Sequence, residues 1–308
     1  MKASSEAGLI ATIDELIALK ELARGSMRSL RHKADHVGGY TTPLRGRGMD
    51  FSEVRHYQAG DDIRHMEWRV TARTGRAHVK LFEEERERPV VILTDFNPSM
   101  FFGTRGALKS VTAARVSALL AWLGMLQGDR IGGLHFSAQQ HHEWMPRSRH
   151  LGIMPLLASL ASYSQKLPAS TPNTMTARPL SDAFKRLRSV VRPGSLLLLV
   201  SDFYALDEAS LSHASRLHLH ADMMVYHIQD YLECFPPPPG NYVFTNGVAQ
   251  ETLGLHDKAL RERYQATCDQ RAEKVRHWCK DLHIPYSAVR GDHDLAEVIQ
   301  MHFGRRHA

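Results

Sequence analysis

From about residue 89 onwards, hydrophobic residues follow two alternating patterns. Short, wholly apolar runs at 90–94 and 196–200 predict strands that are buried on both faces of a sheet. Between such runs lie longer segments, such as 106–127 and 180–191, whose apolar residues recur at helical spacing. Apolar strands that alternate with amphipathic helices indicate a Rossmann-like α/β fold, in which helices flank a mostly parallel sheet.

The same patterns predict the remaining elements and a domain plan. Further strands are expected at 131–136, 223–228 and 284–289, a hairpin at 241–252, and helices at 149–161, 207–220, 257–281 and 294–303. Upstream, 8–34 has helical periodicity, whereas 44–88 consists of short alternating runs separated by glycines, which favours hairpins or short strands. We therefore expect three parts: an amphipathic helix in 1–40, a β-rich region in 41–88, and an α/β domain in 89–308 with a hairpin insertion near 230–255.

Composition excludes several classes of protein. Of the 308 residues, 43% are hydrophobic and 23% are charged, which is typical of a folded globular chain. No apolar run approaches the roughly 20 residues of a membrane-spanning helix, and acidic residues interrupt the apolar stretch near the N-terminus, so a secretory signal is not expected. Cys234, Cys268 and Cys279 form no disulfide or zinc pattern, which favours the cytoplasm.

The net charge of +6 is unevenly distributed. Residues 101–200 alone carry 12 Lys and Arg against 3 Asp and Glu. Because this excess lies within folded elements rather than in a tail, it indicates a surface or anion site that meets an acidic partner. Nucleic-acid binding is an alternative, but no nucleic-acid-binding motif accompanies the charge.

Two carboxylates follow two of the predicted buried strands. Asp95 ends one strand and Asp202 ends another, and ligands of open parallel sheets bind at the carboxyl ends of the strands. Asn97 and Ser99 follow Asp95 at alternate positions, so oxygen-bearing side chains could converge on a hard cation such as Mg²⁺. The alternative is that these residues only cap the turn that follows the strand.

Two other groups of residues invite simpler interpretations. In 45–88, arginines alternate with acidic residues, which favours internal charge pairing over a nucleic-acid site, and Phe51, Tyr57 and Trp68 are expected to anchor a core. The 19 histidines have no metal-binding spacing. His135, His141 and His142 are therefore expected to be solvated surface residues.

Four stretches resemble the family called domain of unknown function 58. The longest begins with RGRGMDFSEVRHYQAGDDIRHMEW at Arg45 and continues through Ser99, and the others are GDRIGGLHF at 128–136, RPGSLLLLVSDF at 192–203 and DYLECFPPPPGNYVF at 230–244. The resemblance implies a von Willebrand factor type A-like fold. It further implies a metal-ion-dependent adhesion site built from a D-x-S-x-S loop, a downstream threonine and a second aspartate.

Carried over by position, the resemblance assigns Asp95, Asn97 and Ser99 to the loop and Asp202 to the second aspartate. Arg178 stands at the expected threonine position, where a guanidinium would repel a dication. Either Thr174 or Thr176 could supply the missing hydroxyl, or Arg178 could itself pair with the two aspartates.

The resemblance implies a protein without established catalytic activity that works with a MoxR-type AAA+ ATPase, or with its client, in assembly, maturation or stress response. We therefore expect a non-enzymatic interaction module whose sheet edge engages an acidic partner, with or without Mg²⁺. An alternative is a phosphate hydrolase of the haloacid-dehalogenase type with Asp95 as nucleophile. That chemistry needs a general acid two residues on, where this chain has Asn97.

Overall fold

The structure is a computed structural model that describes residues 8–36, 50–58, 60–83, 87–166, 180–245 and 250–298. The chain divides into two compact units. Residues 1–32 and 88–308 form the larger unit, and residues 33–87 form the smaller one. Thr174, Thr176 and Arg178, together with the second half of the helix predicted at 294–303, lie outside the described residues.

A six-stranded sheet forms the centre of the larger unit, with the strand order β10-β7-β6-β3-β4-β5. All neighbouring strands run parallel except β4 and β5, which are antiparallel. This arrangement confirms the predicted Rossmann-like fold class. The strands span β3 Pro89–Asp95, β4 Arg130–Phe136, β5 His141–Ser148, β6 Leu196–Ser201, β7 Asp222–Gln229 and β10 Tyr286–Arg290.

The edge strand β5 was not predicted. It follows β4 through a tight turn, in which the backbone N–H of Ser137 donates to the carbonyl of Gln140. Its residues are half-buried or exposed, so it lacks the apolar run that marks the central strands. A polar strand at a sheet edge is typical, because one side of the strand faces water.

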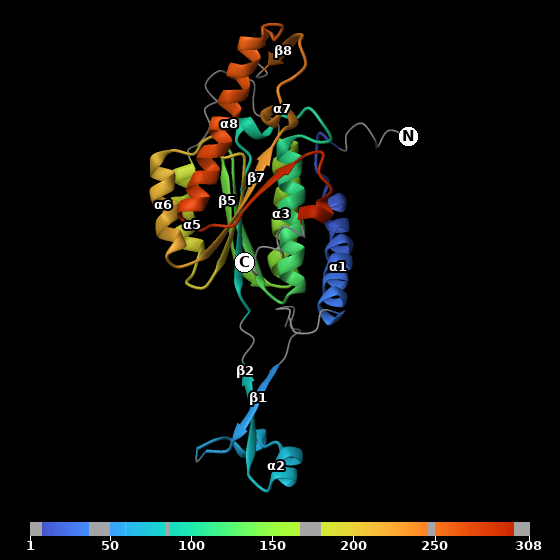
Figure 1. Cartoon of the computed structure of the whole chain (residues 1–308), viewed down its shortest axis with the longest axis vertical. Helices are drawn as coiled ribbons and strands as arrows, with labels where there is room; N and C mark the ends of the chain where they lie inside the picture. The colour runs from blue at the N-terminus through green and yellow to red at the C-terminus, as the bar shows by residue number, and fades with distance from the viewer. Residues whose placement is uncertain are drawn as a thin grey trace. The chain divides into compact units, whose positions relative to one another are not determined.

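Helices cover both faces of the sheet (Figure 1). α1 and α3 lie on one face, α4 packs against α3, and α5, α6 and α8 lie on the other face. The helices span α1 Ile13–His36, α3 Lys109–Leu126, α4 His150–Gln165, α5 Leu180–Val190, α6 Glu208–His218, α7 Tyr231–Cys234 and α8 Lys258–Asp281. The predicted hairpin is also present, as β8 Asn241–Thr245 paired with β9 Gln250–Gly254. No helix in the described part of the chain is long and apolar enough to span a membrane.

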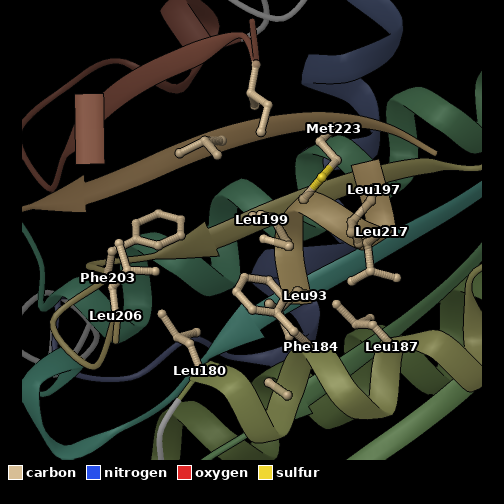
Figure 2. Close-up of a cluster of buried hydrophobic side chains, with 14 of the residues drawn as sticks. Leu93, Leu180, Phe184, Leu187, Leu197, Leu199, Phe203, Leu206, Leu217 and Met223 are labelled. Atoms are coloured by element: carbon tan, nitrogen blue, oxygen red, sulfur yellow. The ribbon is translucent and has the colours of Figure 1, made fainter. Parts of the chain in front are cut away.

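A hydrophobic cluster lies between the sheet and α5, α6 and α8 (Figure 2). Alternate residues of the central strands, such as Leu93, Leu197 and Leu199, point toward Phe184 and Leu187 of α5. The intervening residues of the same strands are also buried, because α3 covers the opposite face. Burial on both faces explains why these strands are apolar throughout.

Helix α1 packs on the same chain through its first turns. Trp122 of α3 donates its indole N–H to the carbonyl of Leu16 at 2.9 Å, and Arg115 of α3 pairs with Glu15 at 2.6 Å. The backbone N–H of Ala11, just before the helix, donates to Ser164 of α4. The amphipathic pattern of this helix is therefore explained by an intramolecular contact.

The smaller unit is built around a hairpin of β1 Asp50–His56 and β2 His78–Glu83. The strands were predicted, but the connection between them also contains a 3₁₀ turn at Ile63–His65 and the helix α2 Trp68–Thr74. Arg55 forms a two-pronged pair with Asp61, so part of the predicted charge pairing is present. Trp68 is 64% exposed at the start of α2, so its expected role as a core anchor was wrong.

The expectation that His135 is a solvated surface residue was also wrong. This side chain is fully buried on the side of β4 that faces α4, where its Nδ1 lies 3.0 Å from Ser159 Oγ. Burial lowers the pKa of His135 to about 3, so the ring is neutral at physiological pH. β4 is buried on both faces from Ile131 to Phe136, so His135 lies inside, which a count of histidines could not reveal.

Candidate functional site

The candidate site lies where the strand order of the sheet reverses. β3 and β6 are neighbours, whereas the connections that leave them run toward opposite edges. Such a switch point opens a crevice at the carboxyl ends of the two strands. Asp95 is the last residue of β3, and Asp202 follows β6 directly. The structure therefore brings the two predicted aspartates together.

Asp95 is fully buried, and both of its carboxylate oxygens accept hydrogen bonds. The backbone N–H of Asn97 donates to Oδ1 at 2.8 Å, and the hydroxyl of Ser201 donates to Oδ2 at 2.6 Å. Ser201 in turn accepts a hydrogen bond from the backbone N–H of Phe203. Asp95 thus fixes the turn after β3 and ties it to the end of β6, as the turn-capping interpretation expected.

A lysine that was not predicted lies beside Asp202. Lys109, the first residue of α3, donates to Asp202 Oδ2 at 2.9 Å and to Glu233 Oε1 at 2.6 Å. The side chains of Lys109 and Asp202 are each only 3% exposed, whereas that of Glu233 is 30% exposed. Asp202 also accepts a hydrogen bond from the backbone N–H of Tyr204. The result is a buried ion-pair network that joins α3, β6 and α7.

Glu233 links this network to the loops at the carboxyl ends of the strands. Its second carboxylate oxygen accepts from the backbone N–H of Asp230, and Asp230 caps α7 in return. Asp230 also accepts two hydrogen bonds from Thr104, one from the backbone N–H and one from the hydroxyl. The loop after β3 and the loop after β7 are therefore held against the same charged network.

The pKa values of the two aspartates are shifted in opposite directions. Burial and the neighbouring charge of Asp202 raise the pKa of Asp95 to about 7. Burial alone would also raise the pKa of Asp202, but the Lys109 ammonium keeps it below its usual value. The pKa of Lys109 is raised, because Asp202 and Glu233 outweigh the effect of burial. Near neutral pH, Asp95 is therefore the member of the network that can exchange a proton.

The other residues of the predicted metal loop are also placed at the site. Asn97 is fully buried and begins the short 3₁₀ turn Pro98–Met100, within which Ser99 lies. Ser99 Oγ is buried beside Asp202, where it helps to keep the pKa of that carboxyl below its usual value.

Comparison with known proteins gives the family of the chain. The family described as "Protein of unknown function DUF58" matches residues 53–274, which include Asp95, Lys109, Asp202 and Glu233. The chain belongs to the DUF58 family.

This DUF58 protein is similar to uncharacterised proteins of two mycobacteria. It is 26% identical over 285 residues to one from Mycobacterium tuberculosis strain H37Rv and to one from Mycobacterium bovis. Each match covers 90% of this chain and 87% of the relative. Among solved structures, it is similar to a conserved hypothetical protein BatB from Bacteroides thetaiotaomicron, with 14% identity and a TM-score of 0.43 over 72% of this chain and 100% of that chain.

Sequence reasoning missed Lys109 and Glu233 in this DUF58 protein, although each has a recognisable signal. Lys109 begins a helix that is otherwise apolar on nearly every face, and a cation in such a helix needs a buried carboxylate. Glu233 stands three residues after Asp230, which is the spacing of a capping box. Neither signal identifies the residue with which Lys109 or Glu233 pairs, because the pairing depends on which strand ends lie side by side in the sheet.

The donor set of the site is compatible with a hard cation in two respects. Ser99 Oγ is a buried oxygen beside Asp202, and Asp95 lies close enough to Asp202 for their charges to repel. Mg²⁺ prefers such oxygen ligands and would relieve this repulsion. The described residues contain no cluster of three or more His, Cys, Asp and Glu side chains suited to a metal. Any cation here would therefore depend on Asp95, Asn97, Ser99 and Asp202, with Lys109 already bound to Asp202.

The same geometry does not favour Asp95 as a nucleophile. Its side chain has no exposed surface, and both oxygens are engaged with Asn97 and Ser201. A phosphate ester would have to displace the hydrogen bonds that hold the turn. The neighbouring Asn97 supplies no carboxylic acid for proton transfer.

Proposed function

We propose that this DUF58 protein is a non-enzymatic interaction module that binds an acidic protein partner at the carboxyl edge of its sheet. The observation that carries the proposal is the buried Lys109–Asp202–Glu233 network at the switch point. Its charged groups bond to one another, which suits a rigid binding surface better than a catalytic centre. The position of the network, where open α/β sheets bind their ligands, supports a role in recognition.

The proposed partner is a MoxR-type AAA+ ATPase or a client of that ATPase. The resemblance of 45–99, 128–136, 192–203 and 230–244 to the family supports this choice, because that family is associated with such ATPases. A von Willebrand factor type A-like domain is consistent with the parallel sheet and its flanking helices. The partner would carry an acidic residue, which matches the basic character of the middle of the chain.

The proposal predicts that a change at the carboxyl edge weakens partner recovery. We expect Asp202→Asn, which keeps the shape of the side chain but breaks the ion pair that holds Lys109 in place, to recover much less of the MoxR-type ATPase of the same organism than the wild type does. Arg216→Ala is the matched control. Arg216 lies in the last turn of α6, which leads into the first residue of β7, at the opposite end of the sheet from Asp202. The measurement is affinity capture of purified ATPase by immobilised full-length protein.

Equal recovery by the wild type and Asp202→Asn would remove the carboxyl edge from the interface. Failure of the wild type to recover the ATPase would contradict the choice of partner. Circular dichroism and thermal unfolding of each variant show whether a loss of binding reflects a loss of folding.

We further propose that Mg²⁺ binds beside Asp95, Asn97, Ser99 and Asp202. At pH 8, millimolar Mg²⁺ is expected to raise the Tm of the wild type, because a ligand at about 100 times its Kd stabilises the folded state by about 2.7 kcal/mol. Ser99→Ala, which removes only the buried hydroxyl beside Asp202, should lose this response. The measurement is differential scanning calorimetry with Mg²⁺ and then with excess chelator. The same Tm shift in Ser99→Ala, or no shift in the wild type, would contradict the metal proposal.

A further inference from the structure

A small pocket lies beside the charged network, between the end of β6 and helix α8. Asp202, Tyr204, Gln229 and Glu233 contribute to one side, and Cys268, Arg271 and Lys274 belong to the part that α8 provides. Its volume is about 130 Å³. Pockets for drug-sized molecules hold roughly 300–1,000 Å³. The pocket is therefore the size of a few water molecules or a single side chain rather than of a nucleotide.

Two cations of the pocket are held in place but have no carboxylate partner among the described residues. The Arg271 guanidinium lies 4.5 Å from the centre of the Tyr204 ring and donates to the tyrosine hydroxyl at 3.1 Å. Lys274 Nζ donates to the carbonyl of Leu206, also at 3.1 Å. Elsewhere on α8, Arg276 and Lys258 pair with glutamates of the same helix. Both residues are exposed, so the donors that these contacts leave over are open to solvent or to a ligand.

The acidic residues of the pocket do not satisfy these cations. Asp202 and Glu233 bond to Lys109, which lies between them. His227, also in the pocket wall, is neutral near pH 7, because burial lowers its pKa to about 4. Among the residues that line the pocket, Arg271 and Lys274 balance Asp202 and Glu233 in charge, but both carboxylates are already bonded to Lys109. The remaining donors of Arg271 and Lys274 therefore favour an anion.

We propose that the pocket receives one acidic side chain of the protein partner, with its carboxylate bound by Arg271 and Lys274. The inference rests on the proposed interaction function and names the residues through which an acidic partner is recognised. An arginine presents parallel donors that match a carboxylate, and the nearby lysine adds charge. Tyr204 is 55% exposed and its ring lies beside Arg271, so the ring can cover the methylene groups of the incoming side chain.

The direct test uses a small probe of one acidic side chain. N-acetyl-L-glutamate N-methylamide is titrated into full-length protein while the Arg side-chain Nε–H and Tyr ring signals are followed by NMR, with assignment through Arg271→Gln. We expect saturable shifts with this probe and none with the neutral isostere N-acetyl-L-glutamine N-methylamide. Arg271→Gln/Lys274→Gln should weaken binding by about tenfold or more, since charge-assisted hydrogen bonds are lost. Lys258→Gln, on the exposed first turn of α8, is the matched control.

Absence of saturable shifts, or equal binding by the double variant, would overturn the inference. Inorganic phosphate tests for a free anion, and tighter binding of phosphate than of the glutamate probe would also overturn it. A parallel capture of the MoxR-type ATPase separates the two proposals. If the probe binds but the ATPase does not, the choice of partner fails and the pocket stands. If the ATPase binds the wild type and the double variant equally, the pocket fails and the interaction module stands.

Discussion

Replacing Lys109 with methionine is expected to destabilise the larger unit by on the order of 3–5 kcal/mol, because it leaves buried carboxylates without their cation. Methionine fills much of the same volume, so lost packing contributes little to the effect. The side chains of Lys109 and Asp202 are both 3% exposed, so water cannot solvate the Asp202 carboxylate once the ammonium is removed. For a unit of this size, the loss corresponds to a fall in Tm of roughly 10 °C, measurable by calorimetry.

Double-mutant analysis distinguishes a charge effect from a general packing effect. Lys109→Met/Asp202→Asn removes both members of the pair, and it should be more stable than Lys109→Met alone. Lys185→Met is the matched control, because Lys185 forms a solvent-exposed contact with Asp182 at 3.8 Å, which contributes little. If Lys109→Met unfolds at the wild-type temperature, the buried network does not stabilise the fold. If the two substitutions are simply additive, Lys109 and Asp202 are not coupled.

The elements that position the site could be predicted because their signals are local. β3 and β6 each contain an apolar run, and an aspartate stands two residues after the last apolar residue of each run, so the sequence places Asp95 and Asp202 at strand ends. That the two ends are neighbours follows only from the strand order of the sheet. The general rule for open parallel sheets was sufficient to predict their convergence.

The partners of those aspartates could not be predicted in the same way. Lys109 lies 93 residues from Asp202 and 124 residues from Glu233, and no local pattern records such distances. Its contacts arise because α3 begins at the edge where β6 and β7 end. Trp68 and His135 show the converse limit, since residue type suggested burial for the first and exposure for the second. In both cases the position within a helix or strand decided the outcome.

Asp95→Asn is expected to make the protein more stable than the wild type at pH 8 but not at pH 4. The raised pKa of Asp95, about 7 in the folded state against 3.8 as the ordinary value, means that the folded state binds this proton more tightly than the unfolded state does. The resulting stability is fully present below about pH 4 and is lost as the pH rises toward 7. At about 1.4 kcal/mol per unit of pKa, the loss is on the order of 4 kcal/mol.

Asparagine reproduces the protonated carboxyl at every pH. Its carbonyl can accept from the backbone N–H of Asn97, and its amide can donate to Ser201 Oγ, so the turn keeps its hydrogen bonds. The difference in unfolding free energy between Asp95→Asn and the wild type should therefore be near zero at pH 4. It should grow between pH 4 and 7 and remain constant above pH 7. Urea unfolding at each pH measures this difference.

The difference curve is more informative than either curve alone, because other buried groups also titrate in this range. His135 and His227 have pKa values lowered to about 3 and about 4, so both proteins lose stability as the pH falls below about 6.5. These contributions cancel between the two proteins. A flat difference curve would show that Asp95 titrates normally in the folded state. A curve that instead decreases with pH would show that its carboxylate is stabilised, and the charge repulsion assigned to Asp202 would then be wrong.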